Sequence, residues 1–322
     1  MKLAPWLEPA WNVLAENLRT AQLHHALLFG GPRGYGKRAL ADAFAGAALC
    51  RERNADRRAC GRCRSCLLVA AGSHPDLVRV TFELRDDGRP RTDITIDQMR
   101  ALGQRLAMAS QFGGWQIAIV DPADAMTANA ANALLKTLEE PARETVLALV
   151  ADDPSRLPAT IRSRCRRVDV VLPSQAVALE WLREQGLPAD AAAATLAASL
   201  GNPGQAHEWA SDGGLALLAE CSADLGALSA ERTRPVAVAQ RWAADRPDRR
   251  LWLAATLVRE EARRLGAGER GALGLTARGE IPKLNAWFAR ANRARGLLST
   301  PLRAELVLLD LLRAWPARLG KT

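Results

Sequence analysis

Apolar residues in the first half of the chain alternate between short uninterrupted runs and positions at helical spacing. The short runs predict buried strands at residues 25–29, 76–82, 116–120, 145–150 and 168–172. Helical spacing predicts helices at residues 6–18, 37–49, 97–109, 127–140 and 157–163. Asp97 is the expected N-cap of the third helix. Strands that alternate with helices imply an α/β fold, with a parallel sheet covered by helices on both faces.

After Pro173 the strand pattern stops, and the remaining residues are rich in Ala, Leu and Arg at helical spacing. We place domain boundaries near Pro173 and Ser211. They predict a first domain over 1–172, a small helical domain over 173–210 and a larger helical domain over 211–322. In the last domain we expect leucine stripes to form helix-packing cores; they comprise Leu251, Leu253, Leu257, Leu306, Leu309 and Leu312.

A phosphate-binding loop is indicated by the spacing of Gly31-Pro32-Arg33-Gly34-Tyr35-Gly36-Lys37, between a predicted strand and a predicted helix. Such a loop normally continues with a Ser or Thr whose hydroxyl holds Mg²⁺, but position 38 is Arg. The strand at 116–120 ends at Asp121, as a Walker B strand does, and Pro122 stands where an ATPase carries a catalytic Glu. Asp121 could hold Mg²⁺ through water, with Asp124 nearby, but neither replaces that base.

Two interpretations of this loop remain open from the residues alone. In the first, the candidate phosphate-binding residues Gly31, Gly34, Gly36 and Lys37 hold a nucleotide. In the second, the loop is vestigial and binds nothing, because the missing hydroxyl removes affinity for a metal–nucleotide complex. Both interpretations predict that the chain alone does not hydrolyse ATP.

Four cysteines, Cys50, Cys60, Cys63 and Cys66, are separated by nine, two and two residues. Thiolates in overlapping C-x-x-C turns can point at one ion, and four of them close a tetrahedron, so we expect a structural zinc site. Unligated thiols would be an oxidation hazard, and no thioredoxin-like context supports a redox pair. Cys165 and Cys221 are expected to be ordinary buried residues.

The net charge of +9 favours acidic partners such as nucleic acid. Arg outnumbers Lys by 39 to 5, which a GC-rich coding bias explains equally well, so the charge locates no binding surface. No apolar run approaches the roughly 20 residues that span a bilayer. The N-terminus has no signal-peptide pattern, so we expect a cytoplasmic protein with reduced cysteines.

Several motifs follow one another along the chain in a recognisable order. They are His24-His25-Ala26-Leu27-Leu28, the altered P-loop, the four cysteines after its helix, Ser73-His74-Pro75-Asp76, the run Asn132–Pro141 and Ser163-Arg164-Cys165. Together they resemble the delta-prime subunits of bacterial DNA polymerase III, in the clamp-loader branch of AAA+ proteins. The resemblance is sharp over 24–172, weaker over 173–210, and beyond that depends on the order and length of the helices.

The resemblance implies an AAA+ P-loop domain with a zinc module at about 50–66, a small helical lid and an all-α collar. It implies a non-hydrolysing stator that joins gamma/tau and delta subunits in a hetero-pentamer, which loads the sliding clamp on primer-template DNA. It also implies that Arg164 is an arginine finger acting in trans on the ATP of an adjacent gamma/tau subunit. The chain is then an inactive subunit of a larger enzyme complex, the DNA-directed DNA polymerase III holoenzyme.

Two other functions are weighed against this one. An active gamma/tau-like ATPase would keep a Ser or Thr, a Glu and a lid Arg where this chain has Arg38, Pro122 and Gly204. A zinc-module DNA-binding protein is supported by the charge and by the Arg-rich insert. However, the insert has no aromatic residue between Cys50 and Cys66 that could stack on bases.

Overall fold

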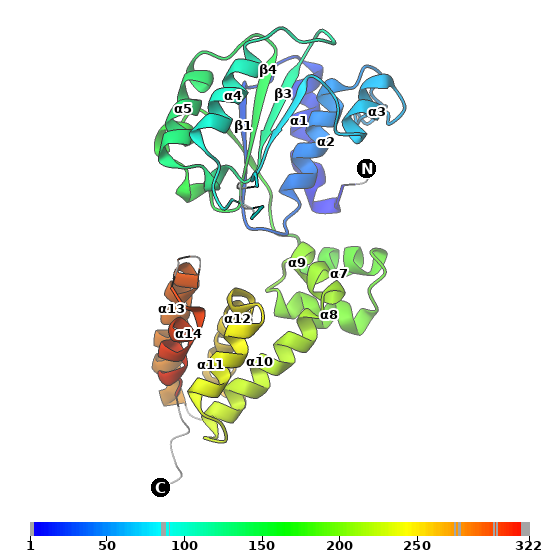
Figure 1. Cartoon of the computed structure of the whole chain (residues 1–322). Coiled ribbons are helices and arrows are strands. Elements are labelled where there is room, and N and C mark those ends of the chain that lie inside the picture. The colour runs from blue at the N-terminus through cyan, green and yellow to red at the C-terminus, as the bar shows by residue number, and fades with distance from the viewer. Residues whose placement is uncertain are drawn as a thin grey trace. The chain divides into compact units, whose positions relative to one another are not determined.

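A computed structural model describes residues 3–84, 88–89, 91–273, 275, 278–298, 300 and 302–316. The chain divides into two compact units, Met1–Val177 and Ala178–Thr322. The first unit contains a sheet, and the described residues of the second are helical (Figure 1).

The sheet of the first unit has five parallel strands. In spatial order they are β2 (Leu77–Val80), β3 (Gln116–Val120), β4 (Thr145–Ala151), β1 (Ala26–Gly30) and β5 (Arg166–Asp169). The inner strands β3 and β4 are buried at every position. A parallel strand covered on both faces needs such a continuous apolar sequence.

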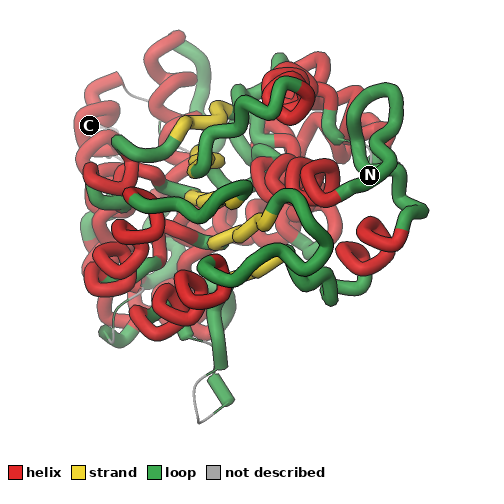
Figure 2. Tube along the Cα trace, turned by 90° about the horizontal axis from the view of Figure 1, so that it is seen from above, coloured by secondary structure: helices red, strands yellow, loops and turns green. Residues whose placement is uncertain are grey.

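Helices cover both faces of the sheet, as the successive side chains of β1 illustrate. Leu27 and Phe29 pack in one apolar cluster with α1 (Glu8–Arg19) and α2 (Lys37–Leu49). Ala26 and Leu28 pack in the opposite cluster, with α4 (Ile96–Leu106), α5 (Ala128–Glu139) and α6 (Ala159–Arg162). Figure 2 shows the strands lying between helices. This arrangement confirms the α/β class expected from the sequence.

Shorter elements complete the first unit. They are the 3₁₀ turns η1 (Pro5–Leu7), η2 (Ala123–Ala125) and η3 (Pro154–Arg156), and helix α3 (Arg64–Ala70).

Eight helices and one 3₁₀ turn follow β5 within the described residues. They are α7 (Gln175–Glu184), α8 (Ala189–Ala198), α9 (Pro203–Ser211), α10 (Gly214–Ser229), α11 (Pro235–Ala244), α12 (Pro247–Ala267), η4 (Arg278–Glu280), α13 (Ile281–Leu298) and α14 (Ala304–Arg313). One apolar cluster lies among α7, α8 and α9. A larger one draws most of its residues from α10 to α14. Among the described residues, no helix is both long and apolar enough to cross a membrane.

Three local expectations from the sequence are wrong. Thr95, not Asp97, caps α4, because Thr95 accepts from the backbone N–H of Gln98 in a capping box. The last strand lies at Arg166–Asp169 rather than 168–172, because its register with β1 begins at Leu27 and Arg166. Leu306 is 62% exposed and lies outside the helical core, although Leu251, Leu253 and Leu312 are buried.

Gly30, at the end of β1, is closely packed against Pro154 of η3. A Cβ at Gly30 would lie 2.6 Å from Cγ of Pro154, so a larger residue would push η3 away from the strand. We expect Gly30→Ala to lower the free energy of unfolding, measured by urea denaturation, by about 1–3 kcal/mol.

Gly46→Ala is the matched control for this substitution. Its Cβ would make an ordinary 3.6 Å contact with Cβ of Ala59, in the interior of α2. There we expect alanine to raise stability by about 0.5–1 kcal/mol, since glycine is a poor helix former. Equal changes in the two variants would contradict the packing argument.

Candidate functional site

The altered P-loop lies at the carboxyl edge of the parallel sheet, where ligands bind in open α/β folds. It connects the end of β1 at Gly30 to the start of α2 at Lys37. Gly36 has a φ of 89°, in the left-handed region that favours glycine, and it precedes the first turn of the helix. Asp121 follows β3, and Asp152 follows β4, at the same edge of the sheet.

The lysine of this loop is turned inward and already has partners. Lys37 is only 1% exposed, and its Nζ donates to the carbonyl oxygen of Pro32 at 3.2 Å. Its ammonium group also forms an ion pair with Asp152. Burial lowers the pKa of Lys37, and the carboxylate of Asp152 only partly offsets that effect. The ammonium group is therefore matched to a carboxylate within the chain.

Arg38 lies between two carboxylates at the sheet edge. Its Nε donates to Asp121 at 2.8 and 3.0 Å, while Nη1 and Nη2 donate to the two carboxylate oxygens of Asp152 at 2.9 and 3.1 Å. Burial alone would lower the pKa of Arg38, but hydrogen bonds to Asp152 and Asp121 outweigh it and raise the pKa. The same contacts, with those from Lys37, hold the pKa of Asp152 below its ordinary value. Two cations and two carboxylates thus form one compensated cluster.

Asp121, which the sequence analysis considered as a Mg²⁺ ligand, is a member of this cluster. Asp121 is bonded to Arg38, and Asp124 instead accepts from the backbone N–H groups of Asp152 and Asp153 at 3.3 and 2.9 Å. Sequence reasoning missed Asp152 as a member of the cluster. Asp152 could have been found from the sequence, because it directly follows the apolar strand at 145–151. The carboxyl end of that strand lies beside the P-loop.

The N-terminal segment packs against the same loop. Nε1 of Trp6 donates to the carbonyl oxygen of Tyr35 at 2.8 Å. A Cβ at Gly36 would lie 2.9 Å from Cδ1 of Leu7, which is a second reason for glycine at this position. The P-loop is therefore held from outside by η1 as well as by its own ion pairs.

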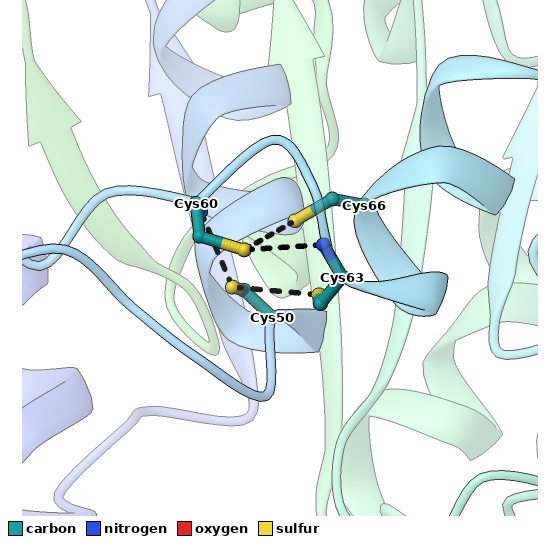
Figure 3. Close-up of side chains that lie close together, drawn as sticks. All are labelled: Cys50, Cys60, Cys63 and Cys66. Carbon is teal, nitrogen blue, oxygen red and sulfur yellow. Dashed lines mark hydrogen bonds between the residues drawn. The ribbon is translucent and has the colours of Figure 1, made fainter.

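The four predicted metal ligands converge on one point between α2 and α3 (Figure 3). Their donor atoms all lie within 4.8 Å of one another. The Sγ atoms of Cys50 and Cys63 are 3.9 Å apart, as are those of Cys60 and Cys66. Zinc–sulfur bonds of about 2.3 Å in a tetrahedron place sulfurs about 3.8 Å apart. The geometry therefore fits a four-coordinate ion of that size.

The polypeptide around these cysteines favours the thiolate at two of them: burial raises the pKa of Cys50 and Cys66, whereas backbone hydrogen bonds lower that of Cys60 and Cys63. The backbone N–H groups of Cys60 and Cys63 donate to Sγ of Cys50 and Cys60, each at 3.3 Å. Burial alone would raise the pKa of Cys63, but backbone hydrogen bonds from Cys66 and Arg51 lower it to about 6. Cys50 and Cys66 are buried and the other two are half-buried. All four ligand positions are taken by protein, as in structural metal sites.

The cysteine module is tied to helix α1 by the loop that it encloses. Arg58 donates to the carboxylate of Glu8 at 2.6 Å, and its guanidinium lies 5.3 Å from the ring centre of Trp11. Arg57 pairs with Glu16 at 2.6 Å. The Arg-rich character of the insert is therefore partly explained by contacts with the chain's own first helix.

His74 and Asp76, from the Ser73–Asp76 motif, support the module from its other side. Nδ1 of His74 accepts from the backbone N–H of Asp76, so Nε2 carries the proton toward Ser65 Oγ, 2.9 Å away. The carboxylate of Asp76 accepts from Ser110 Oγ and from the backbone N–H groups of Gln111 and Phe112. These residues are structural partners of the module rather than metal ligands.

A cavity of about 290 Å³ adjoins the cysteine module. Arg51, Arg53, Phe112 and Trp115 are among its lining residues, so the fold brings aromatic residues to the module that the insert itself lacks. Phe112 is already in contact with His74 and Arg64. Trp115 packs against the core of the sheet. Both rings are thus partly engaged by the protein itself.

Arg164, the candidate arginine finger, lies on the surface just after α6. Its side chain is 38% exposed, and Nη1 donates to the carbonyl oxygen of Thr160 at 2.9 Å. Ser163 Oγ donates to the same carbonyl at 3.2 Å, and Cys165 packs against the core of the sheet. Each residue of the Ser-Arg-Cys motif therefore helps to hold this short turn.

Arg164 has a second partner outside its own turn. Its Nη2 lies 2.8 Å from Oε1 of Glu139, at the end of α5. The side chain of Glu139 is 51% exposed. The ion pair between the two residues was not foreseen. Gly204, where the sequence comparison expected a gamma/tau-like chain to carry an Arg, lies in the first turn of α9.

Known proteins resemble this chain over part of its length. The DNA polymerase III subunit delta' of Pseudomonas aeruginosa is 44% identical over 201 residues, which cover 62% of this chain and 58% of that protein. The corresponding subunit of Escherichia coli K12 is 38% identical over 207 residues, covering 64% of this chain and 60% of that protein. The matched part thus spans about three fifths of the length of these relatives.

More distant relatives and structures also match. The DNA polymerase III subunit tau/gamma of Haemophilus influenzae is 34% identical over 154 residues, covering 48% of this chain and 21% of that protein. A crystal structure of a gamma subunit-related protein from Thermotoga maritima has a TM-score of 0.43 at 17% identity, covering 93% of this chain and 97% of that one.

The family model described as DNA polymerase III, delta subunit, matches residues 6–173. That segment holds the sheet, the altered P-loop, the four cysteines and the Ser-Arg-Cys turn, and it is more than half of the chain. This chain therefore belongs to the DNA polymerase III delta subunit family.

Proposed function

We propose that this chain is the delta-prime, or stator, subunit of a bacterial DNA polymerase III clamp loader. In this role it has no ATPase activity and assembles with gamma/tau and delta subunits. The complex then loads the sliding clamp on primer-template DNA. The names of the relatives support this assignment, since two that carry the delta' name exceed the tau/gamma protein in identity and in matched length.

The observation that carries the proposal is the ion-pair cluster at the P-loop. The guanidinium of Arg38 lies between Asp121 and Asp152, where an ATPase would need a hydroxyl and a carboxylate for Mg²⁺. Lys37 is paired with Asp152, so it is not free to meet outer phosphates. Pro122 offers no group that could activate water. An active gamma/tau-like ATPase is therefore disfavoured, and the degenerate loop needs no nucleotide to balance its charges.

A subunit without chemistry of its own can still act on a neighbour. Arg164 is half-buried, with 38% of its side chain exposed, on a turn held by Ser163 and Cys165. A guanidinium on such a turn can reach the γ-phosphate bound by an adjacent subunit and stabilise the charge that develops there. We assign this role in trans to Arg164.

The four cysteines are assigned to one structural zinc ion, with Cys50, Cys60, Cys63 and Cys66 as its ligands. The tetrahedral spacing of the sulfurs and the closed ligand set support zinc in a structural role. When bound, the metal would hold the end of α2, the Arg-rich loop and α3 together. A zinc-module DNA-binding function has less support, because Arg57 and Arg58 are paired with α1.

The helical part of the chain is assigned to two domains. Residues 173–210 correspond to an AAA+ lid, supported by the separate apolar cluster of α7, α8 and α9. Residues 211–322 correspond to the collar through which clamp-loader subunits associate, supported by the larger cluster of α10 to α14.

The central test is the trans role of Arg164. The chain is assembled with its gamma/tau and delta subunits, and ATP hydrolysis is measured with clamp and primed DNA. We expect Arg164→Ala to slow the partner site that it serves by at least about 100-fold, because trans fingers are worth roughly 10³–10⁵ in kcat.

Size-exclusion chromatography checks that the Arg164→Ala complex still assembles. Arg162→Ala, which removes a neighbouring arginine of the same turn, is the matched control and should hydrolyse ATP at the normal rate. An intact Arg164→Ala complex with normal hydrolysis would remove the basis for a finger.

The purified chain alone should not turn over ATP. With Mg²⁺ present, we expect phosphate release no greater than that of Lys37→Ala, because Arg38 occupies the metal position and position 122 lacks a base. Saturable turnover that disappears in Lys37→Ala would instead identify this chain as a motor subunit.

Loss of one metal ligand should release the ion and loosen the first unit. We expect Cys63→Ser to lower bound zinc, measured by atomic emission, from one ion per chain to well below one. A loss of about 3 kcal/mol should lower the thermal midpoint by roughly 6–12 °C in a unit of this size.

Arg62→Ala is the control, since that exposed side chain lies in the same loop outside the ligand set. It should keep its zinc and its thermal midpoint. Full zinc occupancy in Cys63→Ser would rule out the four-cysteine site.

A further inference from the structure

We propose that Glu139 is a positioning residue for Arg164, which orients the guanidinium so that its remaining N–H groups face outward to a partner's phosphate. The inference rests on the proposed trans function of Arg164. It adds a residue from a different helix to the machinery of that finger.

The guanidinium of Arg164 is held by two acceptors from different elements. Nη1 donates to the carbonyl oxygen of Thr160 at 2.9 Å within the α6 turn. Nη2 lies 2.8 Å from Oε1 of Glu139 on α5. Two fixed acceptors define the plane of a guanidinium, whereas one acceptor leaves it free to rotate. A guanidinium has more N–H donors than these two contacts use, so it can keep both and still bind a third group.

The place of Glu139 in its helix points away from a role in helix stability. It is the last residue of α5, where the negative end of the helix dipole disfavours a carboxylate. The cation of Arg164 compensates this charge. A pair as exposed as this one is worth little for folding, so orientation of Arg164 is the better explanation of the contact.

The end of α5 is itself fixed to the sheet, which makes Glu139 a firm reference point. Leu138 is buried in the cluster beneath α5, and α5 is in contact with α6. The carboxylate of Glu139 is thus attached to a rigid element, although the side chain itself is exposed.

The test uses the complete clamp-loader complex with clamp and primed DNA. We expect Glu139→Ala to lower kcat of the partner site about two- to fivefold, the loss expected for one exposed ion pair, with KM for ATP unchanged. Glu139→Gln should recover much of the rate, because its amide oxygen can still accept from Nη2. The kcat of Arg164→Ala, measured in the same way, gives the effect of losing the arginine altogether.

Glu140→Ala is the matched control, because it removes the adjacent exposed carboxylate outside the Arg164 pair. It should retain the wild-type kcat. A normal or faster rate in Glu139→Ala, beside a slow Arg164→Ala, would overturn the positioning role and leave the finger intact. A normal rate in Arg164→Ala would overturn the proposed trans function itself, so the two failures are distinguishable.

Discussion

The ion-pair cluster of Lys37, Arg38, Asp121 and Asp152 joins the start of α2 to the ends of β3 and β4. Three strand ends of a parallel sheet meet at one edge, where a nucleotide and its metal normally balance the charges of the loop. Here the chain balances them internally, because the guanidinium of Arg38 donates to Asp121 through Nε and to Asp152 through Nη1 and Nη2. Removing Asp152 would leave the buried ammonium group of Lys37 without a carboxylate, which costs more than the pair itself contributes.

An internally balanced P-loop separates two tasks that an active ATPase combines. The P-loop edge keeps a defined shape without ligand, supported by Trp6 and Leu7 from the N-terminal segment. The turn after α6 instead presents Arg164 at the surface. In the proposed function, Arg164 would serve a neighbouring ATP site while the P-loop of this chain stays inert.

The cysteine module extends this support to the first helix. Its loop pairs with Glu8 and Glu16 of α1, while α1 also packs in the cluster beneath the sheet. A metal ion that holds the module would thus stabilise contacts well beyond its four ligands. Two of the arginines that suggested nucleic-acid binding, Arg57 and Arg58, are therefore already paired within the chain.

The sequence by itself determined the elements and the chemistry of single positions. Strand β3 and helix α2 were predicted with their observed bounds, because buried parallel strands are continuous apolar runs and helices show a regular apolar spacing. The cap of α4 and the register of β5 were missed, since a competing side chain and a neighbouring strand decided them.

The pairings between distant side chains depend on the tertiary structure. Asp152 reaches Arg38 across 114 positions, and Glu139 meets Arg164 from another helix. Local sequence specifies residue types and periods, whereas such contacts exist only once the strands lie side by side.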